Sequence, residues 1–220
     1  LNQVSINIPA GSFHALLGEN GAGKSTLVKC IMGFYRVTEG ELLVAGQEAR
    51  LSDQKMAQNR KLGMVYQHFT LVPSLTAAEN LVISRADIPA VIDWRRERRR
   101  LDAFMADMPF LVPSDQPVSR LAAGEKQKLE ILKQLYLGNR FLILDEPTSV
   151  LTPAEANEVL SHVRALTDAG EITVLMITHK YREVTAFADN VSILRRGKYV
   201  GGGKVAPMSI KDMSHAMMGE

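Results

Sequence analysis

One eight-residue segment near the start of the chain limits its fold more than any other feature. Residues 18–25 read Gly-Glu-Asn-Gly-Ala-Gly-Lys-Ser and match the pattern G-x-x-x-x-G-K-[ST] in full. An apolar stretch typical of a strand precedes them at residues 12–17, and a helical pattern follows to about residue 32. Glycines in such a loop let backbone N–H groups surround a phosphate, and the helix N-terminus adds positive potential. The segment therefore predicts a phosphate-binding loop in an α/β protein.

The residues that close this loop carry its chemistry. We expect the Lys24 ammonium to reach the β- and γ-phosphates of a nucleotide and the Ser25 hydroxyl to bind Mg²⁺. The full set expected along the phosphates is Gly18, Asn20, Gly21, Ala22, Gly23, Lys24, Ser25 and Thr26.

A second motif supplies the acidic partner of this loop. Residues 141–144 form an apolar, strand-like run that ends in Asp145 and Glu146. Two acids after a strand are weak evidence alone, because strand ends are often charged and solvated. Beside a phosphate loop, Asp145 is expected to hold Mg²⁺ and Glu146 to act as general base on the attacking water.

The rest of the chain alternates strand-like and helical patterns, as an α/β protein should. We expect a core of mainly parallel strands with an antiparallel β edge near the N-terminus. Residues 68–120 contain no convincing strand and five prolines, and predict a separate helical lobe. Gly201-Gly202-Gly203 is interpreted as a flexible break before a short terminal helix.

Composition narrows the class of protein. With 220 residues, 46% of them hydrophobic, the chain can form one domain with a sizeable core. A net charge of +2 gives no indication of nucleic acid as a partner, and the arginine-rich residues 94–100 fit a solvated helix face above Leu101, Phe104 and Met105. The single cysteine, Cys30, favours a reducing, cytoplasmic setting.

Further motifs, in a fixed order, resemble those of the ATP-binding-cassette (ABC) ATPases. Gln67, after the strand-like residues 64–66, looks like the family glutamine that senses Mg²⁺ and links to the membrane partner. His179 is similar to the family's switch histidine at the γ-phosphate. The family signature that opens a helix is matched by Leu121, Ala122, Ala123, Gly124 and Glu125.

This resemblance covers essentially the whole chain and carries the family's properties as expectations. It implies one nucleotide-binding domain at residues 1–220, a P-loop NTPase core at about 1–67 and 121–220, and a helical lobe at about 68–120. It implies Mg²⁺ with ATP, Ser25, Gln67 and Asp145 as Mg²⁺ ligands, and catalysis by Glu146, His179 and Gln67. It also implies a head-to-tail dimer with a second ABC domain.

Two departures from the family pattern suggest unequal sites in that dimer. The signature normally continues Ser-Gly-Gly-Gln after its Leu, whereas Ala122 lacks the hydroxyl and Glu125 adds a negative charge. Thr152 occupies the place of an aspartate that crosses the dimer interface. Neutral drift is the alternative explanation.

Three functions compete on these residues: a transporter motor, a soluble ABC ATPase of DNA repair or translation, and another phosphate-loop enzyme such as a kinase. The signature and Gln67 disfavour the kinase. Gln67 and Leu121 are 54 positions apart (121 − 67), which leaves no room for the long coiled coil of the repair relatives.

Residues 130–133, 145–153 and 178–180 are similar to the first half of bacterial sugar and nucleoside importers with two cassettes in one chain. That resemblance implies membrane-spanning permease subunits and a peripheral place on the cytoplasmic face of the bacterial inner membrane.

Overall fold

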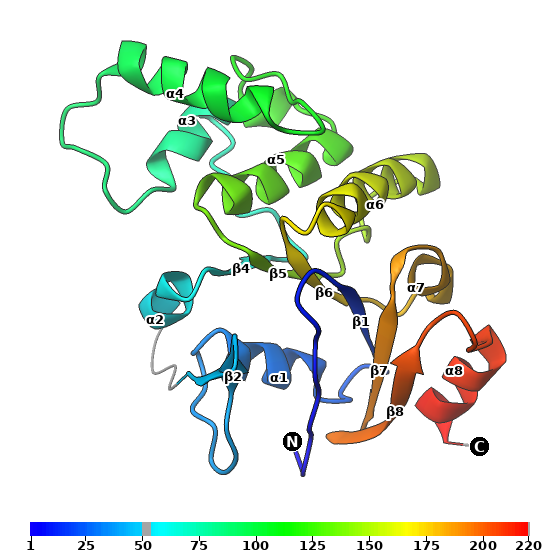
Figure 1. Ribbon diagram of the computed structural model, residues 1–220. Helices are drawn as coiled ribbons and strands as arrows, with labels where there is room; N and C mark the ends of the chain where they lie inside the picture. The colour runs from blue at the N-terminus through cyan, green and yellow to red at the C-terminus, as the bar shows by residue number, and fades with distance from the viewer. Residues whose placement is uncertain (50–53, 220) are drawn as a thin grey trace.

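The computed structural model describes residues 1–49 and 54–219, which fold around a six-stranded sheet (Figure 1). The strand order is β4 (Leu62–Val65), β5 (Phe141–Asp145), β6 (Thr173–Ile177), β1 (Phe13–Leu17), β7 (Asn190–Arg195) and β8 (Lys198–Lys204). Neighbours from β4 to β7 pair in parallel, and β8 pairs antiparallel with β7. The predicted mainly parallel core with an antiparallel edge is thus confirmed.

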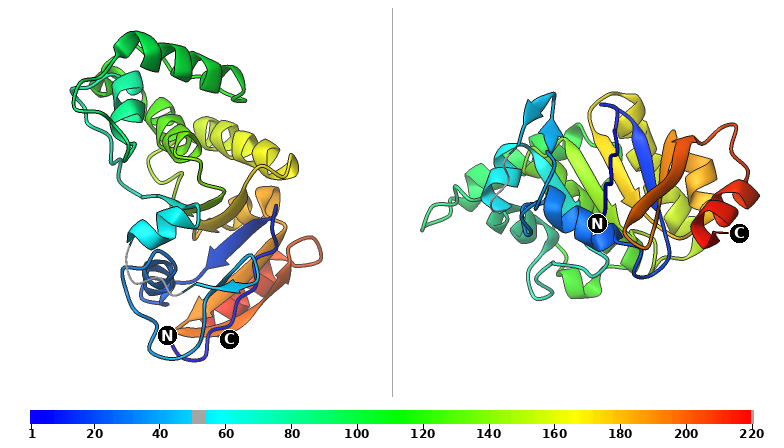
Figure 2. Two further views of the ribbon diagram at one scale, coloured as in Figure 1. Left: turned by 60° about the vertical axis from the view of Figure 1, so that its left-hand side comes forward. Right: turned by 90° about the horizontal axis from the view of Figure 1, so that it is seen from below.

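Helices cover both faces of the sheet (Figures 1 and 2). Leu16, Ile143 and Leu175 pack with Val28 of α1 (Lys24–Ile31) and with α2 (Gln54–Asn59) on one face. Alternate residues such as Phe13 pack on the other face against α5 (Ala123–Tyr136) and α6 (Pro153–Asp168). α7 (Tyr181–Phe187) and α8 (Ile210–Met218) extend that second layer. Burial on both faces explains why the strands read as continuous apolar runs.

Residues 68–120 form the part that lies farthest from α1 in Figure 1. They contain α3 (Ala77–Ile83), α4 (Trp94–Ala106) and a 3₁₀ turn at Val118–Arg120, and α3 contacts α5. The side chain of Glu97 on α4 forms a 2.7 Å ion pair with Arg85. Leu101 is buried while the arginines of α4 are exposed, so the predicted solvated face is confirmed.

Helix starts follow their sequence signals. Thr76 accepts the backbone N–H of Glu79, and Thr152 accepts that of Glu155, each in a reciprocal capping box. Pro153 occupies the first turn of α6, where it costs no hydrogen bond. With 16 residues, α6 is the longest of the described helices, and none of them is long and apolar enough to span a bilayer.

Two details of the expected β structure were wrong, namely where the antiparallel edge lies and what the glycine run at residues 201–203 forms. The antiparallel strands near the N-terminus, β2 (Leu43–Val44) and β3 (Gln47–Glu48), form a small sheet of their own, and the antiparallel edge of the main sheet is β8. Gly201-Gly202-Gly203 lies inside β8 rather than in a flexible break. A Cβ at Gly202 would come 2.3 Å from the Val191 oxygen, so glycine there permits close pairing with β7. The sequence also predicts a helix at about residues 53–60, which corresponds to α2, and residue 53 lies outside the described residues.

His14 on β1 makes the stability of the fold depend on pH. Its side chain is buried, its Nε2 lies 2.9 Å from the Ser192 hydroxyl, and burial lowers its pKa from 6.5 to about 4. The folded state therefore holds His14 neutral at pH values where the unfolded chain binds a proton. The stability of the folded state that depends on neutral His14 is fully present above pH 6.5 and is lost as the pH falls toward 4.

We expect the free energy of unfolding to fall between pH 7 and pH 5 by on the order of 2 kcal/mol more in the wild type than in His14→Gln. Urea unfolding of both proteins at the two pH values measures this difference. Equal pH dependence in the two proteins would contradict the assignment.

Candidate functional site

The loop at residues 18–25 joins β1 to α1 and has the backbone of a phosphate cradle. Gly21 and Gly23 have φ values of +82° and +103°, in the left-handed region that favours glycine. A Cβ at Gly18 would lie 2.6 Å from the Leu194 oxygen, so no side chain fits there. α1 has no side-chain cap and no acid in its first turn. Its N-terminal amide groups are therefore left for an anionic ligand.

The Lys24 side chain folds back over this loop. Its Nζ donates to the Gly18 oxygen at 2.6 Å and to the Glu19 oxygen at 3.0 Å. Burial lowers the pKa of Lys24, and the charges of Glu146 and then Asp145 oppose that shift. A cation thus lies at the mouth of the cradle and faces two carboxylates.

Asp145 and Glu146 emerge where β5 ends. Burial raises the pKa of Asp145, the Glu146 charge raises it further, and Lys24 lowers it. Glu146 has a left-handed backbone, with φ +49°, and its N–H donates to the Ile177 oxygen at 2.9 Å. A non-glycine residue in this conformation is strained, and such strain is typical of functional sites.

His179 meets Glu146 across 33 positions of sequence. The Nδ1 of His179 lies 2.9 Å from Oε1 of Glu146, so a proton on Nδ1 donates to the carboxylate. The Glu146 side chain is 15% exposed and that of His179 is 63% exposed. A ligand that approaches from solvent can therefore reach His179, whereas Glu146 is mostly covered.

Gln67 follows β4 at the same edge of the sheet. Val65 pairs with Leu144, so Gln67, two residues beyond Val65, leaves the sheet beside the end of β5. Its side chain is exposed. The carboxyl ends of β1, β4, β5 and β6 therefore bring together the loop, Gln67, the acids and His179, which is where open α/β sheets bind ligands.

Residues 121–125 are not gathered with this cluster. They lead into α5, which packs on the face of the sheet opposite to α1 (Figure 1). Leu121 is buried, and Oε2 of Glu125 accepts the Ala122 N–H at 2.8 Å. The carboxylate of Glu155 on α6 accepts from Thr152 and also from the Gly124 backbone, and these contacts hold its pKa below the usual range.

Three residues that sequence reasoning missed tie the Glu146 segment to the His179 segment. Lys180 Nζ donates to both oxygens of Thr148 at 2.9 Å. Oε1 of Glu183 accepts the Thr148 hydroxyl at 2.5 Å. Thr148 is buried, whereas the side chain of Lys180 is 36% exposed, so these contacts lie at the border between the core and the surface. In the sequence, Thr148 lies two positions after Glu146, and Lys180 directly follows His179. No sequence pattern indicates that these two segments contact each other.

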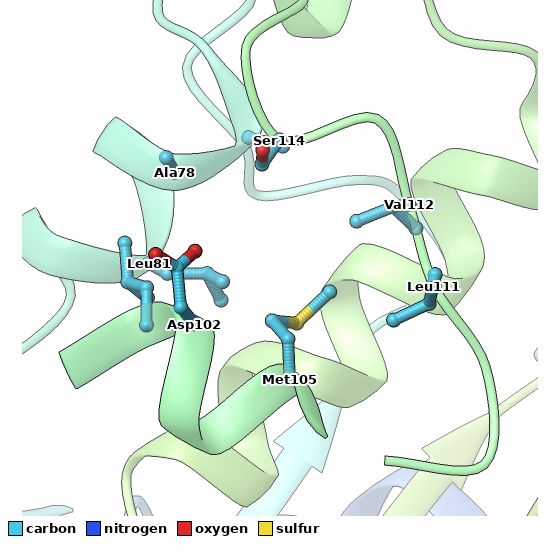
Figure 3. Close-up of a pocket in the computed structure, with 9 residues that line it drawn as sticks. Ala78, Leu81, Asp102, Met105, Leu111, Val112 and Ser114 are labelled. Atoms are coloured by element: carbon cyan, nitrogen blue, oxygen red, sulfur yellow. The ribbon is translucent and has the colours of Figure 1, made fainter. Parts of the chain in front are cut away.

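A cavity of about 190 Å³ lies away from this edge, between α3, α4 and residues 111–114 (Figure 3). Its lining is mostly apolar, with Leu81, Met105 and Val112 among the residues that surround it. Asp102 is the charged side chain in the lining. The cavity contains none of the residues that carry the nucleotide motifs, so it is no part of the phosphate site.

Comparison with known proteins identifies the same family. The family model described as ABC transporter matches residues 1–149. The "Nucleoside import ATP-binding protein NupA" of Lactococcus lactis is 35% identical over 219 residues, which cover 99% of this chain and 43% of that protein. The "Ribose import ATP-binding protein RbsA" of Hahella chejuensis is 34% identical and is matched over 100% of this chain and 44% of its own length. The chain thus spans less than half the length of these curated relatives.

Solved structures agree with these sequence matches. The Clostridium perfringens protein cbiO1, titled part of the ABC transporter complex cbiONQ, superposes with a TM-score of 0.82 at 25% identity, over 95% of this chain and 84% of that one. An ATP-binding cassette titled as a dimeric post-hydrolysis state bound to ADP and Pi gives 0.71 at 26% identity, over 91% and 88% of the two chains. With the phosphate loop, the acids and His179 at one edge of such a fold, the chain belongs to the ABC transporter family.

Proposed function

We propose that this chain is the ATP-binding and ATP-hydrolysing motor domain of a bacterial ABC importer for simple sugars or nucleosides. The observation that carries the proposal is the meeting of Lys24, Asp145 and the Glu146–His179 pair at one edge of the sheet. The relatives named for nucleoside and ribose import supply the substrate class.

The phosphate loop binds the substrate ATP. Backbone groups of Gly18, Asn20, Gly21, Ala22 and Gly23 surround the phosphates, and the side chains of Lys24, Ser25 and Thr26 close the cradle. The uncapped N-terminus of α1 supports this role, because its amide groups have no competing side-chain acceptor. The Lys24 ammonium then exchanges its contacts with Gly18 and Glu19 for contacts with phosphate oxygens.

Ser25, Gln67 and Asp145 form a donor set suited to Mg²⁺. All three offer oxygen atoms, which Mg²⁺ prefers. Asp145 and Lys24 lie close enough to shift each other's pKa. Because Ser25 directly follows Lys24 in α1, the Ser25 hydroxyl and the Asp145 carboxylate lie at the same edge of the sheet. A bound Mg²⁺ would neutralise phosphate charge there.

Glu146 serves as the general base. Its carboxylate takes a proton from the water that attacks the γ-phosphorus, while the bond from this phosphorus to the bridging oxygen breaks and ADP leaves. His179 holds the carboxylate through Nδ1 and contacts the γ-phosphate with its exposed side. Gln67 orients the water and reports nucleotide state to the membrane partner.

A second ABC domain completes the site in a head-to-tail dimer, and permease subunits place the dimer on the cytoplasmic face of the inner membrane. The packing of α5 and α1 on opposite faces supports the dimer, because the signature residues do not reach the phosphate loop of the same chain. We infer that the second domain belongs to the same full-length protein.

Uptake of labelled ribose and of labelled nucleosides by proteoliposomes that contain the complete transporter and ATP tests the proposal. Absence of uptake of ribose and of nucleosides, with ATP hydrolysis intact, would refute the substrate class that these relatives suggest.

The two sites of that dimer are expected to be unequal. The site completed by Ala122 and Glu125 lacks a hydroxyl and places a carboxylate beside the phosphates, whereas the site with Lys24 and Glu146 has its full set. Transport should therefore depend on the latter. The double substitution Ala122→Ser with Glu125→Gln should change the transport rate by less than about twofold, since Gln still accepts the Ala122 N–H.

The comparison is made by uptake into proteoliposomes, with wild type and Lys24→Ala measured alongside. A severalfold gain in transport from the double substitution would show that the signature of this chain limits the cycle, against the proposal.

A further inference from the structure

A buried carboxylate on α5 contacts the segment that carries Gln67. Glu130 is only 1% exposed. Its Oε1 accepts the backbone N–H of Thr70, and its two oxygens lie 3.0 and 3.2 Å from the Thr70 hydroxyl. Lys133 completes a triangle, with its Nζ 2.6 Å from Oε2 of Glu130 and 2.5 Å from the Thr70 hydroxyl oxygen.

Thr70 lies three positions after Gln67, in the segment 66–70 that follows the end of β4. The contacts between Glu130 and Thr70 therefore hold this segment against one side chain of α5.

The burial of the Glu130 carboxylate costs free energy. A buried carboxylate is unfavourable until ion pairs and hydrogen bonds compensate it, and apolar residues of similar volume often stabilise a core at least as well. An apolar side chain at position 130 could pack in α5, but it could not accept the Thr70 N–H. The polar contact therefore fixes the position of the 66–70 backbone rather than only filling space.

We propose that Glu130 is a positioning residue for Gln67, which it holds at the Asp145–Glu146 edge through Thr70. The inference rests on the proposed role of Gln67 in hydrolysis. Because α5 also begins at the signature residues, one rigid helix joins the surface offered to the second ABC domain to the segment that aims Gln67. Lys133 assists by neutralising the carboxylate.

The test measures kcat and KM for ATP in the complete transporter with four variants, and a fifth is held in reserve. Glu130→Ala should lower kcat by about tenfold or more, since small misplacements of a catalytic group are costly, with KM changed by less than about twofold because the phosphate loop is untouched. Glu130→Gln keeps an oxygen for the Thr70 N–H and should recover most of the lost kcat. Gln134→Ala is the matched control, because Gln134 is also a buried polar residue of α5 but accepts from Asn139 at 2.9 Å instead.

Gln67→Ala separates this inference from the proposed function. Low kcat in Gln67→Ala with normal kcat in Glu130→Ala would overturn the inference alone. Normal kcat in Gln67→Ala would overturn both. An equal fall of kcat in Glu130→Ala and Gln134→Ala would show a general stability effect and would also overturn it. If Glu130→Ala does not fold, Thr70→Ala decides, with a severalfold loss of kcat expected and an unchanged kcat contradicting the proposal.

Discussion

Replacing Glu146 with Gln is expected to lower ATP turnover by roughly 10²-fold or more while ATP still binds. The amide keeps the shape of the side chain and can still accept a hydrogen bond from His179 Nδ1. It cannot take up the proton that the attacking water releases. The loss should therefore fall on kcat and leave the affinity for ATP close to the wild-type value.

Steady-state phosphate release from the complete transporter measures turnover, and nucleotide titration measures binding. Glu171→Gln is a suitable control, because Glu171 is an exposed carboxylate outside the site. Turnover near the wild-type rate in Glu146→Gln would assign the base to another group.

Lys24→Ala should weaken the binding of Mg-ATP on the order of 10²-fold, the size expected when charge-assisted hydrogen bonds to phosphate are lost. The Lys24 ammonium lies over the loop and faces both acids at the end of β5. Without it, those carboxylates would repel the phosphates with no cation to offset them. Uptake by the transporter should then be abolished.

Calorimetric titration of ATP into the wild type and the variant measures the affinity. Lys29→Ala is the matched control, because Lys29 lies on the same helix but its Nζ is directed at the Tyr35 ring, 5.1 Å from the centroid. An unchanged affinity in a folded Lys24→Ala protein would refute the role assigned to this lysine.

Short sequence motifs are enough to predict those parts of the fold that depend on neighbouring residues. The capping patterns at Thr76 and Thr152 indicate helix starts from the sequence alone, because the cap and its Glu lie within one turn. Apolar runs predicted the central strands, since strands buried on both faces need such residues. The phosphate loop was evident because its glycine spacing is dictated by backbone geometry.

Contacts between segments far apart in the sequence could not be predicted from such motifs. Gly201–Gly203 suggested a flexible break, yet pairing with β7 turns it into strand β8, a tertiary effect that propensity does not contain. Glu130 shares a spacing of i, i+3 and i+7 with Gln127 and Gln134, which in sequence looks like a solvated helix face. All three are buried, because α5 is covered on that side as well. The family resemblance placed His179 at the γ-phosphate, and only the structure showed its contact with Glu146.

If this chain couples ATP hydrolysis to import, as we propose, uptake depends on hydrolysis at the site of Glu146. ATP hydrolysis and substrate uptake can be measured together in proteoliposomes that contain the complete transporter, with and without Glu146→Gln. We expect both rates to fall by the same factor in the variant, so that the ratio of substrate imported to ATP hydrolysed is unchanged. Uptake that continues at the wild-type rate while hydrolysis at this site is lost would contradict it.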